Sequence, residues 1–412
     1  MKSKKSAMFP KSKPKVRKRK RVKKRLKKKD LLNPARTRKK NNCRNMIKKK
    51  EGKKIQVPSL SQMEGWVKRH WLYLAIGAFI VAVTSVVLLV YAVFGAGDGA
   101  AQVETGFQAP TSTQVDDGLA PRWLDGIRVP EEEAKLLPRA VMIENHVDAR
   151  PLAGIADASL VFEAPVEGGI TRLMAVFDAS TTVPLIGPVR SARPYYVEWA
   201  QALDALYAHV GGSPEALNRI GGLVNFRNLD EMAGESYFWR SKSRPAPHNV
   251  FTNSENLAQK ADDKNWSAGE FEPWIFIPEE EGFKPGDIHA IFIPFDGSYK
   301  VKWVYDTESN SYARYLGGRR DQDNKGSKIN AKNILVIQTE QRTLDDVGRL
   351  FIRTTGRGKA WYFASGNAKE VVWTREPGEF YTIKTPDGRD VAFLPGNTWI
   401  EIASLPKYEP DF

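Results

Sequence analysis

Residues 160–177 read LVFEAPVEGGITRLMAVF, two apolar runs joined by a short polar turn. Apolar runs of this length that contain Val and Phe are typical of β-strands. Gly168-Gly169 marks the bend, because glycine accepts backbone conformations that other residues avoid. Glu163 lies in the first run, Glu167 at the turn and Arg172 in the second run. We therefore expect a hairpin with two carboxylates and a guanidinium close to its turn.

The rest of the C-terminal region continues this pattern of short strands and adds a few helices. Helical periodicity is found at 193–208, 213–220, 254–264 and 343–349, and Ser213-Pro214 is a typical helix start. The other predicted strands are 140–143, 275–277, 290–293, 300–305, 334–338, 359–363, 369–374, 379–382, 391–394 and 398–402. Because the helices gather between 190 and 265, the sequence predicts an α/β (α+β) fold class. An α/β-type domain at 122–272 is expected to precede a β-rich domain at 273–412.

Side chains suited to binding or catalysis gather in the first of these domains. Arginine is a forked donor for carboxylate or phosphate, and glycine turns at 168–169 and 211–212 let a ligand approach backbone N–H groups. Histidine and glutamate can act as acid, base or metal ligand. The candidate ligand-binding residues are His146, Glu163, Glu167, Arg172, Arg190, Arg193, His209, Ser213, Arg240, Arg244 and His248.

Three interpretations of this set remain open: an internal network of ion pairs, a pocket for an anionic ligand, and a catalytic site. HExxH, GxSxG and paired CxxC motifs are absent from the sequence. The only cysteine is Cys43, so thiol chemistry and disulfides are excluded from everything after it. We therefore predict neither a metal nor a cofactor and assign no catalytic residue.

An uncharged run precedes the folded region: WLYLAIGAFIVAVTSVVLLVYAVF at residues 71–94. As a helix it reaches roughly 36 Å, enough to cross a hydrocarbon core about 30 Å thick. We predict a transmembrane helix, with a cleaved signal peptide and a buried core helix as alternatives. Cys43 lies before the run rather than just after it, unlike the cysteine of a standard lipoprotein.

Charge divides the chain at the same place. Residues 1–70 carry a net charge of +26, whereas the remainder carries −11. The positive-inside bias predicts a single-pass protein of the bacterial cytoplasmic membrane, with its N-terminus cytoplasmic and its folded part extracytoplasmic. We expect a disordered tail at 1–70 that contacts the anionic inner leaflet, and a flexible linker at 95–121. Nucleic acid is not expected as a partner, except through the tail.

Several stretches together resemble the YerB-like family of envelope proteins, catalogued as a domain of unknown function, DUF3048. They are ARPLAGIADASLVFEAPVEGGITRLMAVFD (149–178), IGPVRSARPYYVEWA (186–200), YAHVGGSPEAL (207–217) and APHNVFT (246–252). GRGKAWYF (356–363), VVWTREP (371–377) and LPGNTWIEI (394–402) resemble that family's second domain. The resemblance implies two domains and an outward-facing protein, bound to the membrane, with no established enzymatic activity.

The leading functional hypothesis is a membrane-anchored extracytoplasmic protein that binds an anionic or cell-wall-related ligand, or an envelope partner. One alternative is an envelope hydrolase or wall-modifying enzyme that uses Glu163 or Glu167 with His209 or His248. Another is a scaffold whose functional end is the basic cytoplasmic tail.

Overall fold

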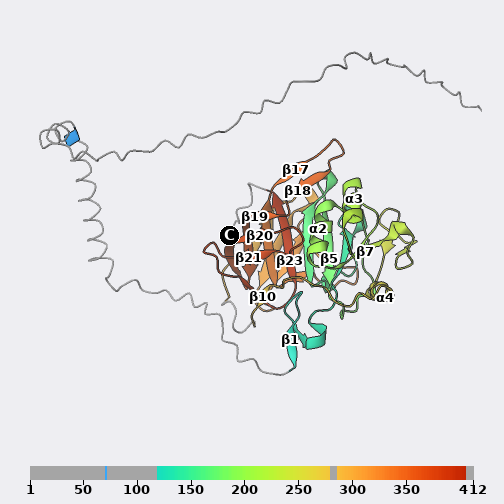
Figure 1. Ribbon diagram of the computed structural model, residues 1–412, viewed down its shortest axis with the longest axis horizontal. Helices are drawn as coiled ribbons and strands as arrows, with labels where there is room; N and C mark the ends of the chain where they lie inside the picture. Colours follow the sequence, from blue (N-terminus) through green and yellow to red (C-terminus); the bar gives the residue numbers. More distant parts are fainter. Residues whose placement is uncertain (1–69, 72–117, 279–284, 405–412) are drawn as a thin grey trace, which may run out of the picture. The chain divides into compact units, whose positions relative to one another are not determined.

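The computed structural model describes residues 70–71, 118–278 and 285–404, and its central feature is a ten-stranded sheet (Figure 1). The opening hairpin forms as expected, from β4 (Leu160–Pro165) and β5 (Thr171–Phe177) in antiparallel register. The strand order is β21-β20-β19-β16-β23-β4-β5-β3-β6-β7. The remaining strands are β3 (Arg139–Glu144), β6 (Leu206–His209), β7 (Asn228–Asp230), β16 (Asn333–Thr339), β19 (Gly356–Ala364), β20 (Asn367–Arg375), β21 (Thr382–Lys384) and β23 (Thr398–Ser404).

The strand β23 connects the N-terminal and C-terminal parts of this sheet. It runs parallel to β16 on one side and parallel to β4 on the other. Its register with β16 extends from Thr398 opposite Asn333 to Ser404 opposite Thr339, and Glu401 lies opposite Glu163 of β4. The last described strand of the chain therefore lies in the middle of the sheet.

Both faces of the sheet are buried. Along β5, Leu173 and Ala175 face one hydrophobic core, while Met174 and Val176 face the other. This alternation follows from the two-residue period of a strand.

A smaller antiparallel sheet contributes to the first core. It consists of β11 (Ala290–Ile293), β12 (Val301–Asp306), β13 (Ser311–Leu316) and β14 (Arg319–Arg320), with β15 (Asn330–Ala331) paired to β13. Two-stranded pairs surround these sheets: β1 (Leu119–Pro121) with β2 (Arg128–Pro130), β8 (Trp239–Arg240) with β9 (Val250–Phe251), β10 (Ile275–Phe276) with β22 (Ala392–Phe393), and β17 (Gln341–Thr343) with β18 (Leu350–Ile352).

Three α-helices occur in the part of the chain that the structure describes. They are α2 (Pro194–Ala202), α3 (Pro214–Gly222) and α4 (Ser254–Asp263). Helix α2 packs Tyr195, Tyr196 and Trp199 into the second core, and the Ser213 side chain caps α3 by accepting from Ala216 N at 3.2 Å. Short 3₁₀ turns lie between the larger elements: η1 (Glu131–Glu133), η2 (Val147–Ala149), η3 (Ile155–Asp157), η4 (Glu167–Gly169), η5 (Glu231–Ala233) and η7 (Gly297–Tyr299).

The helix predicted at 343–349 is wrong, because this segment is the turn between β17 and β18. The carboxylate of Asp345 accepts hydrogen bonds from Val347 N at 3.1 Å and Arg349 N at 3.2 Å. These side-chain bonds compete with helical backbone bonding and favour the turn.

The predicted fold class is also wrong. The described residues are mainly β-structure with three short helices, and strands from both sides of residue 272 share one sheet. Helical periodicity located α2, α3 and α4, but it extended the first of them over β6 and predicted a helix at 343–349, so it overstated the helical content. The predicted domain limits, including the boundary at 272–273, stay a prediction.

The predicted transmembrane helix requires a correction as well. No helix within residues 118–278 and 285–404 is long and apolar enough to cross a membrane. Residues 72–94 lie outside the described residues, as do most of the predicted tail and linker. The prediction rested mainly on the length and apolarity of the run, which a membrane span requires but which do not by themselves establish one.

Candidate functional site

Most of the candidate side chains lie at one edge of the large sheet, which we call the carboxyl edge. Six strands run in the same direction and end there: β16, β23, β4, β3, β6 and β7. The antiparallel strand β5 begins at this edge with Thr171 and Arg172. In open sheets with parallel strands, ligands bind outside the carboxyl ends of the strands. The topology thus brings together side chains that are far apart in the sequence.

Glu144, at the end of β3, is the centre of a charged cluster at this edge. Its buried carboxylate forms an ion pair with Arg190 and accepts from His146 N at 3.2 Å. Burial opposes its ionisation, but Arg172 and Arg190 lower the pKa of Glu144 below its ordinary value. The carboxylate is therefore held in its charged form between arginines.

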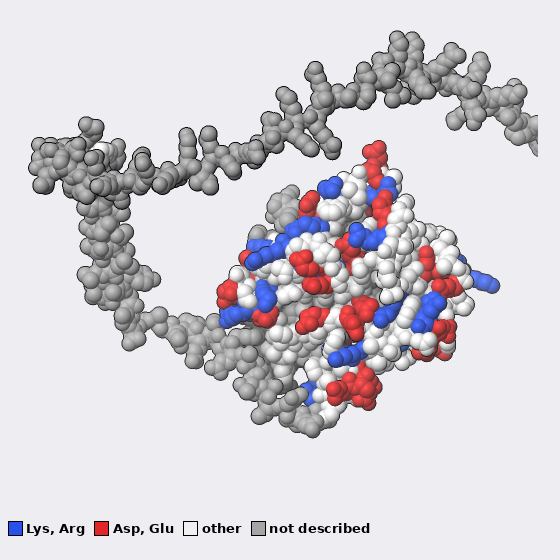
Figure 2. Space-filling view, in the orientation of Figure 1, with Lys and Arg blue, Asp and Glu red and all other residues white. Residues whose placement is uncertain are grey.

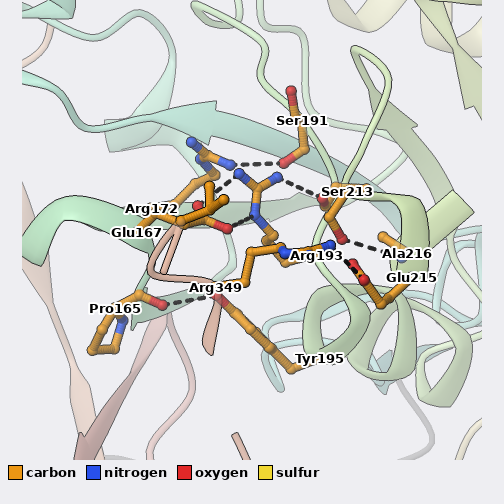
Figure 3. A network of polar contacts seen from close by, with 12 residues as sticks. Pro165, Glu167, Arg172, Ser191, Arg193, Tyr195, Ser213, Glu215, Ala216 and Arg349 are labelled. Atoms are coloured by element: carbon orange, nitrogen blue, oxygen red, sulfur yellow. Dashed lines mark hydrogen bonds and ion pairs between the residues drawn. The ribbon is translucent and has the colours of Figure 1, made fainter. Parts of the chain in front are cut away.

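Arg172 is a poorly compensated charge of this cluster. Its guanidinium is buried and donates one hydrogen bond, from Nη1 to Ser191 O at 3.0 Å (Figure 3). Its Nε is buried without a hydrogen-bond partner among the described residues. Burial and the positive charge of Arg193 lower the pKa of Arg172 from its usual value. A buried cation with spare donors is costly unless a ligand completes its environment.

Arg193 and Glu167 form a separate pair beside it. The guanidinium binds both oxygens of the carboxylate, each at 2.7 Å (Figure 3). This bidentate geometry satisfies Glu167 and fixes the turn after β4 to the start of α2. The pair is therefore mainly structural, although its charges lie next to Arg172.

His146 and His248 complete the cluster on its exposed side. Their rings stack with centroids 5.2 Å apart and planes inclined by 14°. His248 Nδ1 lies 3.7 Å from Glu144 Oε2. Burial and the positive charge of Arg190 lower the pKa of His248, despite the opposing effect of Glu144.

Three of the predicted site residues have internal roles instead. Glu163 is fully buried, accepts from Thr171 Oγ1 at 2.6 Å and binds Arg314 of the smaller sheet. His209 uses both ring nitrogens, toward Gly211 O and Asn228 Oδ1, each at 2.7 Å. Ser213 caps α3, as described above.

The two arginines of the 238–250 segment also bind other parts of the protein. Arg240 is exposed and forms a bidentate pair with Glu231 at 2.9 and 3.0 Å. Arg244 donates to the carbonyls of Ala149 and Pro151, which fixes its segment to the turn after β3. The structure thus brings His146, Arg172, Arg190 and His248 together around Glu144, with Glu167 and Arg193 beside them.

Sequence reasoning missed Glu144, although the stretch Ile143-Glu144-Asn145-His146 contained a signal. A carboxylate at the end of a wholly apolar run is buried on at least one side and must find a cationic partner. Glu144 meets both conditions.

A cavity of about 530 Å³ lies farther along the carboxyl edge. Its mainly apolar lining includes Pro165, Gly168, Gly169, Phe295, Arg342 and Leu350. Both glycines have positive φ, 75° and 70°, which favours glycine at these positions. None of the eleven candidate residues lines this cavity, but its lining includes Val166 and Thr171, the chain neighbours of Glu167 and Arg172.

Glu401→Gln is expected to stabilise the protein at pH 7 and to reduce the loss of stability that occurs as the pH rises above the unfolded pKa of about 4.3. Burial and the Glu163 carboxylate raise the pKa of Glu401 well above its ordinary value. The folded state then holds a proton that the unfolded chain releases above about pH 4.3. This contribution is complete below that pH and is lost as the pH rises toward the folded pKa.

Urea unfolding of Glu401→Gln at several pH values measures this effect. Glutamine keeps the acceptor for Trp303 Nε1, which lies 2.9 Å from Glu401 Oε1. If the stability of the variant falls with pH as steeply as that of the parent protein, Glu401 is not the titrating group.

Comparison with known proteins matches the chain to two family models. Residues 124–267 match the N-terminal domain of DUF3048, described as a protein of unknown function, and residues 291–400 match its C-terminal domain. The "Putative lipoprotein YerB" of Bacillus subtilis (strain 168) is 31% identical over 286 residues, which cover 68% of this chain and 85% of that protein. A crystal structure of the YerB protein from Bacillus subtilis superposes with a TM-score of 0.61 at 28% identity, covering 68% of this chain and 95% of that one.

These findings correct the predicted location. The relative is named as a lipoprotein, a class attached to membranes through lipid rather than through a helix. No helix in the described part of the chain is suited to a span. The single-pass assignment in the cytoplasmic membrane is therefore not retained.

Proposed function

The chain belongs to the DUF3048 family, whose function is unknown, and we propose that its folded unit is an envelope-associated binding protein for a small anionic group. The site is the pair Arg172 and Arg190 at the carboxyl edge. The observation that carries the proposal is the buried Arg172 guanidinium, whose Nε has no hydrogen-bond partner among the described residues.

Arg190 supplies a partly exposed guanidinium next to it. Its side chain is 22% exposed and pairs with Glu144, and it makes no side-chain hydrogen bond to the described residues. A guanidinium has five N–H donors in a planar fork, which matches carboxylate and phosphate oxygens. Arg190 can therefore contact a ligand from solvent while Arg172 holds it from within.

The charge balance of the cluster supports the same conclusion. Arg172, Arg190 and Arg193 face two ionised carboxylates, Glu144 and Glu167. One further anion would offset the excess. On the face shown in Figure 2, by contrast, basic and acidic residues are interspersed. That face therefore gives no support to recognition by a broad charged surface.

The cell envelope is proposed as the place of action because the relative of this chain is named as a lipoprotein. Anionic groups are abundant in envelope polymers and their precursors, so a wall-related ligand belongs to the proposed class.

The hydrolase alternative has less support. Glu163 is bound to Arg314, and both ring nitrogens of His209 are used. Glu167 is paired with Arg193. Neither Glu163 nor Glu167 is therefore free to act as an acid or base with His248. The alternative in which the basic tail is functional concerns residues outside the described part of the chain.

Thermal unfolding of the full chain with inorganic phosphate or citrate tests the proposal. At matched ionic strength, both anions are expected to raise Tm relative to chloride. Arg190→Gln should weaken the apparent affinity about tenfold or more, since hydrogen bonds to charged groups contribute about 1.5–3 kcal/mol.

Arg389→Gln is the matched control, because Arg389 is exposed and pairs with Asp387 of its own turn. It should respond to anions like the parent protein. The proposal fails if neither anion raises Tm, or if Arg190→Gln and Arg389→Gln bind equally well.

A further inference from the structure

We propose that His146, Asp148 and His248 form a binding site for a divalent transition-metal ion. One ligand atom from each residue lies within 4.8 Å of the other two. The inference stands on this geometry and does not depend on the anion site.

The spacing within the first two ligands is close to that of a bound ion. His146 Nδ1 and Asp148 Oδ2 are 3.5 Å apart. Two ligands at about 2.0–2.1 Å from a tetrahedral zinc ion are separated by about 3.3 Å. The ligand atom of His248 lies within 4.8 Å of both, a range that includes this separation.

Local structure explains why these ligands face one another. His146 precedes η2, and its Nδ1 accepts from Asp148 N at 3.2 Å, which curls the carboxylate back toward the ring. Metal binding at Nδ1 would replace this single hydrogen bond. The two ligands thus come from one short turn after β3.

His248 reaches the site from a segment about one hundred residues away, and that segment is firmly held. Arg244 Nη2 donates to Pro151 O at 2.8 Å, and Val189 N donates to Val250 O at 2.8 Å. The first bond holds the segment before His248 next to the turn that follows His146, and the second holds the segment after His248 to Val189.

Glu144 supplies the carboxylate that often supports a metal-binding histidine. Its Oε2 is the acidic atom nearest to His248 Nδ1, at 3.7 Å, and that nitrogen is buried without a hydrogen-bond partner in the described residues. A carboxylate on this side favours the proton on Nδ1 and leaves the Nε2 lone pair for the ion.

The ligand set defines the class of ion. Two imidazoles and one carboxylate suit Zn²⁺, Co²⁺ or Ni²⁺, whereas Mg²⁺ and Ca²⁺ prefer oxygen ligands. Three protein ligands leave a coordination position for water or for a bound molecule. Because Glu144 also pairs with Arg190, that position would lie near the proposed anion site.

Calorimetric titration of the full chain with ZnCl₂, after removal of metal with EDTA, tests the site. We expect His146→Ala and His248→Ala each to lose one binding event, or to weaken it at least 100-fold. Co²⁺ should give a visible absorption band in the parent protein that both variants lack.

His289→Ala is the matched control, because His289 is exposed and outside the cluster. Circular dichroism checks that each variant is folded. Equal zinc binding by the parent protein, His146→Ala and His248→Ala would overturn the inference, and so would an equal loss in His289→Ala.

Discussion

A chain that ends at residue 397 is expected to lose cooperative unfolding, because it lacks β23 from the middle of the sheet. Its loss would separate β16 from β4 and expose the edges of both strands. Trp399, Ile400 and Ile402 are each at most 1% exposed. Each contributes about 1.5–3 kcal/mol by burial. Together with the lost backbone pairing, these contributions approach the free energy of unfolding of about 5–15 kcal/mol that is typical of a folded protein.

Thermal melting followed by near-ultraviolet circular dichroism measures this loss, since buried tryptophans report tertiary packing. A chain that ends at Ser404 keeps β23 and serves as the control for shortening the C-terminus. If the chain ending at 397 melts cooperatively within a few degrees of the parent protein, β23 does not hold the two parts of the sheet together.

Arg314→Met is expected to destabilise the protein by about 3–5 kcal/mol, because it leaves a buried carboxylate unpaired. The Arg314 side chain is 1% exposed and binds both Glu163 of the large sheet and Asp321. It also lies over the Trp399 ring, 4.6 Å from the centroid. The Arg314 side chain of the smaller sheet therefore makes both an ion pair and an aromatic contact with the large sheet.

Urea unfolding of a double-mutant cycle tests this prediction. Adding Glu163→Gln to Arg314→Met should recover part of the loss, since the unpaired charge is then removed. Arg319→Met, at an exposed position of β14, should stay within about 0.5 kcal/mol of the parent protein. A loss below 1 kcal/mol for Arg314→Met would contradict the importance of the buried pair.

Local sequence patterns predicted individual elements well. The hairpin at 160–177 and the strand at 290–293 were found where expected, because alternation and turn residues act within a few positions. The pairing of β4 with β23 was not predictable in this way. These strands are more than two hundred residues apart, and parallel pairing over such a distance leaves no local pattern.

The sequence indicated which residues have side chains suited to a binding site, but not which of them pair with one another in the folded protein. Arg172, Arg190, His146 and His248 do meet at one edge, but Glu163 is taken up by Arg314, which lies 151 positions away. Nothing in the neighbourhood of Glu163 in the sequence shows that partner. The predicted absence of a metal rested on missing motifs, whereas His146 and His248 become neighbours only in the folded chain.

The most direct test of the anion site is the NMR signal of the Arg172 Nε–H group, assigned from its absence in Arg172→Lys. This donor is buried and has no hydrogen-bond partner among the described residues. If an anion completes its environment, titration with phosphate at constant ionic strength should shift the signal progressively and saturably, and the shift should weaken in Arg190→Gln. A signal that stays fixed up to high phosphate concentration would contradict the proposed function.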